Sequence, residues 1–265
     1  MRRFIFAFLV IGFAVSASQA EPALKKEVEL LQIAFDRRFN FDLVQVVELY
    51  AHSEMGELRR TLQMATKRVD GSLHGLAHFM APAELRGTRM LMIERFDRND
   101  DFFLFVPTLK KIRRVSSAQR ADVFMGTDLT YEDFERRYVD DYDVSMVGTT
   151  TIQGEDVYAI RCEPRYESGH KHAIYYVAKS DQAILEIRYF RANRDKPVKV
   201  QRISREKMVT LDGHIVPTGL WVENLLRDTK TDVRFSQIRI NPVVDDRLFS
   251  TSALEVGRRI PYLKR

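Results

Sequence analysis

Residues 85–137 read LRGTRMLMIERFDRNDDFFLFVPTLKKIRRVSSAQRADVFMGTDLTYEDFERR and contain two short runs, 90–93 and 102–106, in which successive positions are large and apolar. Because neighbouring side chains of a strand point to opposite faces of a sheet, both faces of these strands must be covered. We expect the core to cover one face and a lid or a bound ligand to cover the other. A plain core beneath covering helices is the alternative that residue type alone favours.

The sequence on either side of this stretch alternates between apolar and polar residues and is divided by turn signals. Positions 58–65 show the alternation, and an Asp-Gly pair marks the turn at 69–71. Followed along the whole chain, the pattern predicts about eleven to thirteen short strands in one long, strongly curved antiparallel sheet. Helical pieces are expected only near Glu21, Thr130 and Asp245.

The C-terminal third carries signals that shape individual strands. We expect one long strand that ends near Thr210 and a second over 215–226, in which Pro217 marks an edge or a bulge. In the last strand the apolar positions change from odd to even numbers. This change of parity predicts a bulge near Ser236 and Gln237.

The first twenty residues have the layout of a cleaved secretory signal. Two arginines precede an apolar run over 4–15, and Ser-Gln-Ala at 18–20 places small residues before the cleavage point. A retained membrane anchor is the competing interpretation, but a spanning helix needs about 20 apolar residues. We therefore predict a signal peptide over 1–20, export, and a single domain over 21–265.

Charge and cysteine content narrow the function classes further. The chain has 42 Lys and Arg against 37 Asp and Glu, and the charges are interspersed, so its basic pI does not argue for a nucleic-acid partner. Cys162 is the only cysteine, so no internal disulfide can form. It alternates with Tyr158 and Ile160, which predicts a buried small hydrophobe rather than a reactive thiol.

Four motifs of the central stretch resemble a known family. RGT at 86–88, FLFVP at 103–107, KIRRV at 111–115 and FMGTDLTYED at 124–133 are similar to the outer membrane lipoprotein-sorting proteins, in the branch of LolA-like periplasmic proteins. The sequence DDRLFS at 245–250 agrees with the same family. The resemblance implies a mainly β fold with a few helices, an unclosed antiparallel half-barrel of about eleven strands covered by short helices.

The same resemblance implies a function. It points to a periplasmic carrier, not an enzyme, that holds acyl chains of a lipid or lipoprotein in the concave face of the sheet. The carrier would serve an inner-membrane permease of the RND type or outer-membrane lipoprotein sorting. We expect no cofactor, no nucleic-acid partner and a monomeric protein. The chain is longer than the lipoprotein carrier itself, so lipoprotein transport specifically does not follow. A lipid-ester hydrolase and a lipid-sensing regulatory protein are the alternatives on this fold.

The predicted acyl-chain contacts are large apolar residues of the central stretch together with the single tryptophan. They are Met90, Met92, Phe103, Phe105, Phe124, Met125, Tyr131, Phe134 and Trp221. Burying an acyl chain contributes about 0.8 kcal/mol per methylene, so a dozen methylenes would drive uptake without polar recognition. Arg113 and Arg114 are predicted to bind a headgroup phosphate, because guanidinium binds phosphate bidentately. The alternative is that both lie on an exposed strand without a ligand.

The remaining polar patterns predict structural roles. Asp128, Glu132 and Asp133 are expected to cap and begin a short helix at Thr130, where the helix dipole favours acidic residues. The acidic run 97–101 is interpreted as a hairpin turn, since the residue where a calcium loop needs glycine is a phenylalanine. The histidine pairs at 74 and 78 and at 170 and 172 have no acidic or cysteine partner at ligand spacing. We therefore predict no metal site and no catalytic residues.

Overall fold

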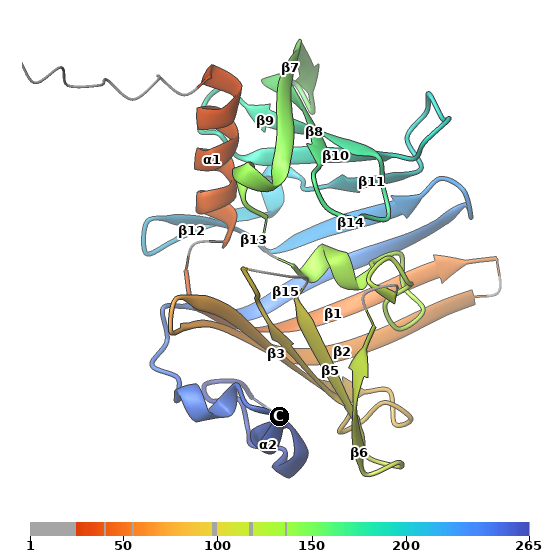
Figure 1. Ribbon diagram of the computed structural model, residues 1–265, viewed down its shortest axis with the longest axis vertical. Helices are drawn as coiled ribbons and strands as arrows, with labels where there is room; N and C mark the ends of the chain where they lie inside the picture. Colours follow the sequence, from red (N-terminus) through yellow and green to blue (C-terminus); the bar gives the residue numbers. More distant parts are fainter. Residues whose placement is uncertain are drawn as a thin grey trace, which may run out of the picture.

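The computed structural model describes residues 25–39, 41–54, 56–96, 100–116, 119–135 and 137–264, so the predicted signal peptide at 1–20 lies outside the described residues. Thirteen strands form one antiparallel sheet (Figure 1). From end to end they are β6 (Lys111–Val115), β5 (Asp101–Val106), β4 (Arg89–Ile93), β3 (Ser72–Ala81), β2 (Gly56–Val69), β1 (Leu43–Ser53), β15 (Thr229–Ile240), β14 (Gly219–Asn224), β11 (Lys199–Arg202), β10 (Ile184–Phe190), β9 (His172–Ala178), β8 (Glu155–Pro164) and β7 (Tyr142–Ile152). The end strands β6 and β7 do not pair with each other in the part of the chain that is described, so the expected unclosed sheet is confirmed.

The chain builds this sheet as two runs of neighbouring strands that meet at β14 and β15. Strands β1 to β6 pair in chain order, and we call them the N-terminal half-sheet. Strands β7 to β11 also pair in chain order and form the C-terminal half-sheet. β15 pairs with β1 and β14 pairs with β11, so the last long strands join the two halves.

The structure contains more strands than the pattern predicted because two expected strands are divided. The one expected to end near Thr210 is interrupted by the 3-10 turn η4 (Arg205–Lys207), after which the chain forms β12 (Met208–Leu211). The one expected over 215–226 is divided after Pro217, whose missing N–H cannot continue a ladder, into β13 (His214–Pro217) and β14. β12 and β13 pair as a separate two-stranded sheet.

The bulge expected near Ser236 and Gln237 is confirmed. The pairing of β1 with β15 shifts between Val44, opposite Arg239, and Val46, opposite Ser236. Gln237 has a positive φ of 52°, the left-handed conformation that allows the extra residue to be inserted. The bulge therefore puts Ile240, which pairs with Leu43, on the same face of the sheet as Val233 and Phe235.

Both faces of the doubly apolar strands β4 and β5 are covered, as the sequence predicted. Met90, Met92 and Phe102 face an apolar cluster that includes the segment between β6 and β7. Leu91 and Phe105 face the opposite way, against a second cluster. That second cluster is closed by side chains of the C-terminal segment: Val244, Leu248, Phe249, Leu254, Ile260 and Leu263.

Short helices supply the covering layers. Helix α1 (Lys26–Phe39) packs Leu31, Ala34 and Phe35 against the C-terminal half-sheet. The C-terminal segment contains the 3-10 turn η5 (Asp246–Leu248) and helix α2 (Thr251–Val256), which ends at Gly257 in the left-handed conformation that glycine favours. The segment between β6 and β7, which we call the cover segment (residues 119–135 and 137–141), contains η2 (Tyr131–Phe134) and η3 (Val139–Asp141). No helix among the described residues combines the length and the apolar character needed to cross a bilayer.

Candidate ligand-binding site

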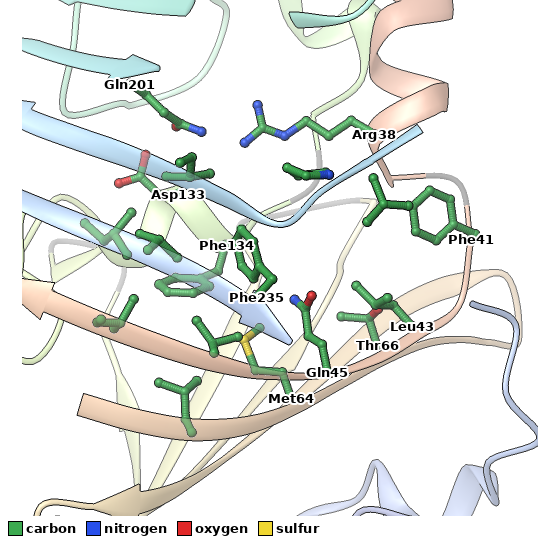
Figure 2. Close-up of a pocket in the computed structure, with 18 of the residues that line it drawn as sticks. Arg38, Phe41, Leu43, Gln45, Met64, Thr66, Asp133, Phe134, Gln201 and Phe235 are labelled. Atoms are coloured by element: carbon green, nitrogen blue, oxygen red, sulfur yellow. The ribbon is translucent and has the colours of Figure 1, made fainter. Parts of the chain in front are cut away.

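A cavity of about 190 Å³ lies between the cover segment and the middle of the sheet (Figure 2). Alternate residues of the central strands form its apolar floor, because only every second side chain of a strand faces one side. These are Leu43, Val47 and Leu49 of β1, Leu62 and Met64 of β2, Leu220 of β14, and Val233 and Phe235 of β15. Leu129 and Phe134 of the cover segment line the cavity from the other side. Its walls are therefore mainly hydrocarbon.

One end of the cavity is polar. Arg38, in the last turn of α1, lines it together with Asp133 of η2 and the amide of Gln201, while Gln45 lies on the floor between Leu43 and Val47. Figure 2 shows the Arg38 guanidinium extending from α1 toward Gln201. Burial lowers the pKa of Arg38, but an arginine stays charged in a protein. The cavity thus combines an apolar floor with a charged end.

The carboxylate of Asp133 is already held by two cations. Lys199 Nζ lies 2.9 and 2.8 Å from its two oxygens, and Arg137 lies 3.7 Å away. Burial alone would raise the pKa of Asp133, but Lys199 and Arg137 outweigh it and lower that pKa overall. Thr130 N and Oγ also donate to Asp133 at 2.8 and 3.0 Å, so the predicted capping role of Asp133 is confirmed.

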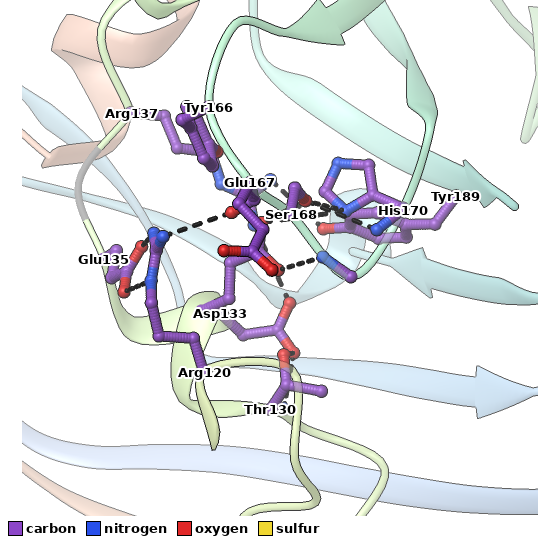
Figure 3. A network of polar contacts seen from close by, with 12 residues as sticks. Arg120, Thr130, Asp133, Glu135, Arg137, Tyr166, Glu167, Ser168, His170 and Tyr189 are labelled. Carbon is purple, nitrogen blue, oxygen red and sulfur yellow. Dashed lines mark hydrogen bonds and ion pairs between the residues drawn. The ribbon is translucent and has the colours of Figure 1, made fainter. Parts of the chain in front are cut away.

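Buried charges attach the cover segment to the C-terminal half-sheet and its loops (Figure 3). Arg120 donates through Nε to Glu135 at 2.7 Å, and its other guanidinium nitrogens contact Glu135 and the carbonyl of Glu167. Arg137 donates to the hydroxyls of Tyr175 and Tyr189. Arg120, Glu135 and Arg137 are all buried. Asp128, by contrast, accepts hydrogen bonds from Thr229 and Thr231 of β15, rather than capping η2.

Ser168, His170 and Glu132 come together in the same network and bear on the hydrolase alternative. Ser168 Oγ donates to Glu132 and lies 3.0 Å from His170 Nδ1. In a catalytic triad the imidazole stands between the hydroxyl and the carboxylate and removes the hydroxyl proton. Here the hydroxyl proton is directed to the carboxylate itself. The geometry is that of a loop tied to the cover segment.

The structure brings only part of the predicted contact set together at the cavity. Phe134 lines it. Met90, Met92, Phe124 and Tyr131 are buried in the adjoining apolar cluster, and Met125 packs against that cluster. No described residue of the set other than Phe134 is on the cavity wall.

Three predicted contacts, Phe103, Phe105 and Trp221, lie on the face of the sheet that is turned away from this cavity. Register is the reason. Met90 pairs with Leu104 and Met92 with Phe102, so Phe103 and Phe105 face the C-terminal segment. Trp221 alternates with Leu220 and Val222, which face the cavity side, and its ring contacts Lys230 Nζ at 5.1 Å.

The predicted headgroup arginines are also remote from the cavity lining. Arg113 and Arg114 are exposed residues of the end strand β6. Arg114 forms an ion pair with Asp101 of β5. Binding of a ligand by any residue of the predicted set stays a prediction.

The polar residues of the cavity were missed from the sequence, although a signal for two of them was present. Gln45 lies inside the apolar run LVQVV, and Gln201 lies inside a short strand, and both are buried. A glutamine at a core-facing strand position is unusual unless it has a partner. Arg38 carries no such signal, because an arginine in the last turn of a helix is also favoured by the helix dipole. Among the described residues, no group of three or more His, Cys, Asp or Glu could hold a metal ion.

Comparison with known proteins places this geometry in context. A protein-family model described as "Uncharacterized protein" matches residues 71–256. No curated protein matches the chain significantly.

Three solved structures share the fold over most of their length. A domain named as an outer membrane lipoprotein-sorting protein, from Vibrio parahaemolyticus, is 21% identical with a TM-score of 0.80, covering 87% of this chain and 98% of its own. A DUF1329 family protein from Desulfovibrio piger is 25% identical with a TM-score of 0.80, covering 86% and 97%. A LolA superfamily protein from Nitrosomonas europaea is 18% identical with a TM-score of 0.71, covering 87% and 100%.

Proposed function

The chain belongs to the family of uncharacterized proteins whose model it matches and has the LolA-like fold, and on that premise we propose that it is a periplasmic carrier for the acyl chain of a lipid or lipoprotein. The observation that carries the proposal is the apolar cavity between the cover segment and strands β1, β2, β14 and β15. The apolar side chains of its floor can contact the methylene groups of an acyl chain. Each methylene that leaves water contributes about 0.8 kcal/mol, so even a short chain is bound without specific polar contacts.

The volume indicates how much of a chain enters without movement of the protein. An apolar cavity of about 150 Å³ accommodates benzene. The cavity here, about 190 Å³, therefore takes a segment of roughly eight carbon atoms. A longer chain requires the cover segment to move away from the N-terminal half-sheet.

The contacts of the cover segment are suited to such a movement. Phe124 packs against Phe79 at 5.9 Å between ring centroids, and Tyr131 packs against Phe102 at 5.7 Å. These contacts are apolar and non-directional, so an acyl chain can replace them with contacts of the same kind. The predicted contacts Met90, Met92, Phe124, Met125 and Tyr131 would then meet the chain after the cover segment has shifted.

The source and destination of the cargo form a further part of the proposal. An inner-membrane permease of the RND type, or outer-membrane lipoprotein sorting, supplies or receives the lipid. The LolA-like fold, the name of the similar Vibrio structure and the predicted signal peptide support this assignment. Fractionation of cells that express the full chain tests the compartment: the mature protein is expected in the periplasmic fraction.

The binding function is tested by lipid extraction and native mass spectrometry of the purified mature protein. We expect a bound mass that extracts into organic solvent. Met64→Trp fills the apolar floor and is expected to reduce the bound fraction severalfold. Val256→Trp, which adds the same ring at a position that is 77% exposed on α2, is the matched control and should retain the lipid. A wild-type protein that is empty and takes up no added fatty acid would contradict the proposal.

The proximity of Ser168 to His170 and Glu132 warrants a direct test of the hydrolase alternative. The purified protein is incubated with p-nitrophenyl octanoate, beside a Ser168→Ala variant. Because the hydroxyl proton is engaged by the carboxylate, we expect equal and background release of nitrophenol from both. Release that depends on Ser168 would make the protein a hydrolase instead of a carrier.

A further inference from the structure

Two glutamines interrupt the apolar lining of the cavity. Gln45 is 8% exposed and Gln201 is 5% exposed, and both line the cavity. A polar side chain in a mainly apolar wall needs a hydrogen-bond partner, and a polar atom of a ligand in the cavity can supply one. Figure 2 shows the amide of Gln201 beside the guanidinium of Arg38, and the amide of Gln45 closer to Phe134 and Phe235.

The charge at this end is positive. Asp133, the one acidic residue among the described lining residues, is engaged by Lys199 and Arg137, which approach it from outside the cavity. Arg38 lines the cavity from the other side. Burial is the main cause that lowers the pKa of Arg38; Arg137 adds to the shift, while Tyr189, Tyr175 and Asp133 oppose it. An anion beside Arg38 would replace part of the hydration that burial removes.

There is also room for one polar atom beside the guanidinium. Arg38 borders a smaller space of about 10 Å³, which Asp133, Arg137, Tyr175 and Gln201 also line. One oxygen atom or water molecule requires about 10–15 Å³. Two guanidinium groups therefore face this space against the single carboxylate of Asp133, which Lys199 already engages.

We infer that the ligand of this cavity is a single-chain amphiphile with an anionic head, and that Arg38 and Gln201 bind that head while the apolar floor binds the chain. The inference rests on the proposed function and names the class of ligand at the same site. Arginine presents two parallel N–H groups to a carboxylate or a phosphate, and the amide of Gln201 adds an N–H donor. The headgroup site is therefore inside the cavity at the end of α1, and not on β6.

The test compares four probes that share an eight-carbon chain: octanoate, octyl phosphate, octanol and octylammonium. Affinities for the purified mature protein are measured by calorimetry at pH 7.5, where the first two are anionic. We expect the tighter of the two anions to bind at least about tenfold more tightly than octanol, since hydrogen bonds to a charged group are the strong ones. Octylammonium should bind most weakly. Whichever anion binds more tightly identifies a fatty acid or a phosphate-bearing lipid as the source of the head.

The variant Arg38→Met keeps side-chain length and removes the charge. The ratio of anion affinity to octanol affinity is expected to fall to about one, and Arg38→Lys should restore part of it. The matched control is Arg37→Met, the exposed neighbour on α1, which should leave the ratio unchanged. If Arg38→Met does not fold, a Gln201→Leu variant is expected to lower the same ratio severalfold.

The failure of this inference is distinguishable from failure of the proposed function. Equal binding of octanoate, octyl phosphate and octanol by the wild-type protein would overturn the anionic head but leave the acyl-chain carrier standing. A parallel loss of all four probes in Arg38→Met would assign Arg38 a structural role and overturn the inference as well. If none of the four probes binds to the wild-type protein, the carrier function itself is contradicted.

Discussion

In the N-terminal half-sheet the cover segment meets the strands through rings and aliphatic side chains, whereas toward the C-terminal half-sheet it is attached through buried charges. Phe124 and Tyr131 pack on Phe79 and Phe102 in the first region. Asp133 pairs with Lys199 of β11, and Arg137 donates to Tyr175 of β9, in the second. The cover segment therefore makes apolar contacts with one half-sheet and charged contacts with the other.

The two attachments differ in what it takes to release them. An apolar contact can be exchanged for a contact with hydrocarbon at small net cost, because a bound acyl chain buries the same surface. Separating a buried ion pair leaves two charges that need partners or water. If the protein binds an acyl chain as proposed, we expect the charged contacts to form the fixed end of the cover segment and the aromatic contacts to open when the chain enters. The cavity lies at the boundary between them, where Asp133 and Phe134 are adjacent in η2.

The largest effect is expected from breaking the buried ion pair inside the cover segment, which holds Arg120 where it donates to the carbonyl of Glu167. Glu135→Gln leaves the buried Arg120 without its carboxylate partner and should lower the free energy of unfolding by about 3–5 kcal/mol. Urea denaturation followed by circular dichroism measures the loss. The double variant Arg120→Met with Glu135→Leu removes both charges and should recover most of it. If the double variant is as unstable as the single one, an unpaired buried charge is not the cause of the loss.

Removing an aromatic contact of the cover segment should cost less stability than Glu135→Gln and should also change ligand binding. Phe124 is fully buried and touches Phe134, which lines the cavity, at 4.6 Å between ring centroids. Phe124→Ala is expected to lower the free energy of unfolding by about 3 kcal/mol. It should also increase the affinity for dodecanoate relative to octanoate, because the deleted ring leaves room for a longer chain.

The matched control for this variant lies on the other face of the same half-sheet. Leu91 is fully buried against the C-terminal segment. Leu91→Ala should be destabilising by a similar amount without altering the preference between the two chain lengths. A preference that changes equally in both variants would show that general loosening, and not the cover segment, controls chain length.

The same contrast explains how much the sequence could predict. Two-sided apolar runs at 90–93 and 102–106 predicted covered strands, and the parity change in the last strand predicted its bulge, because both depend on local alternation. Which face of β5 turns toward the cavity depends on its pairing with β4, and the sequence does not state that register. Selecting Phe103 and Phe105 was a choice between two equally apolar faces.

The polar end of the cavity was out of reach for a related reason. Arg38, Gln45 and Gln201 come from α1, β1 and β11, and they line one cavity only because β14 and β15 join the two half-sheets. Contacts of that kind are set by long-range strand order. The motif at 124–133 did locate the cover segment, since its capping residues Thr130 and Asp133 act locally.

Acidification should lower the free energy of unfolding through two buried histidines, His78 and His170. We expect this loss to be smaller than that caused by the variants above. Burial lowers the pKa of His78 to about 4, with a contribution from Arg89, in the N-terminal half-sheet. Burial also lowers the pKa of His170 to about 4; Glu132 opposes this shift, while Arg137 and Lys199 add to it. Since an unfolded histidine has a pKa near 6.5, the unfolded chain takes up the protons first. Stability is therefore complete above about pH 6.5 and is lost as the pH falls toward 4.

Each histidine is expected to contribute about 1–2 kcal/mol to the loss of unfolding free energy between pH 7 and pH 5. Urea denaturation at the two pH values, on the wild-type protein and on His78→Gln and His170→Gln, separates the contributions. Because His78 is in β3 and His170 is in the loop between β8 and β9, their effects should add. Hydrogen exchange at pH 5 shows where the loss occurs. Amides of the cover segment near Glu132 should lose protection in the wild-type protein and retain it in His170→Gln. Equal loss of protection in both proteins would show that the fixed end is not weakened through His170.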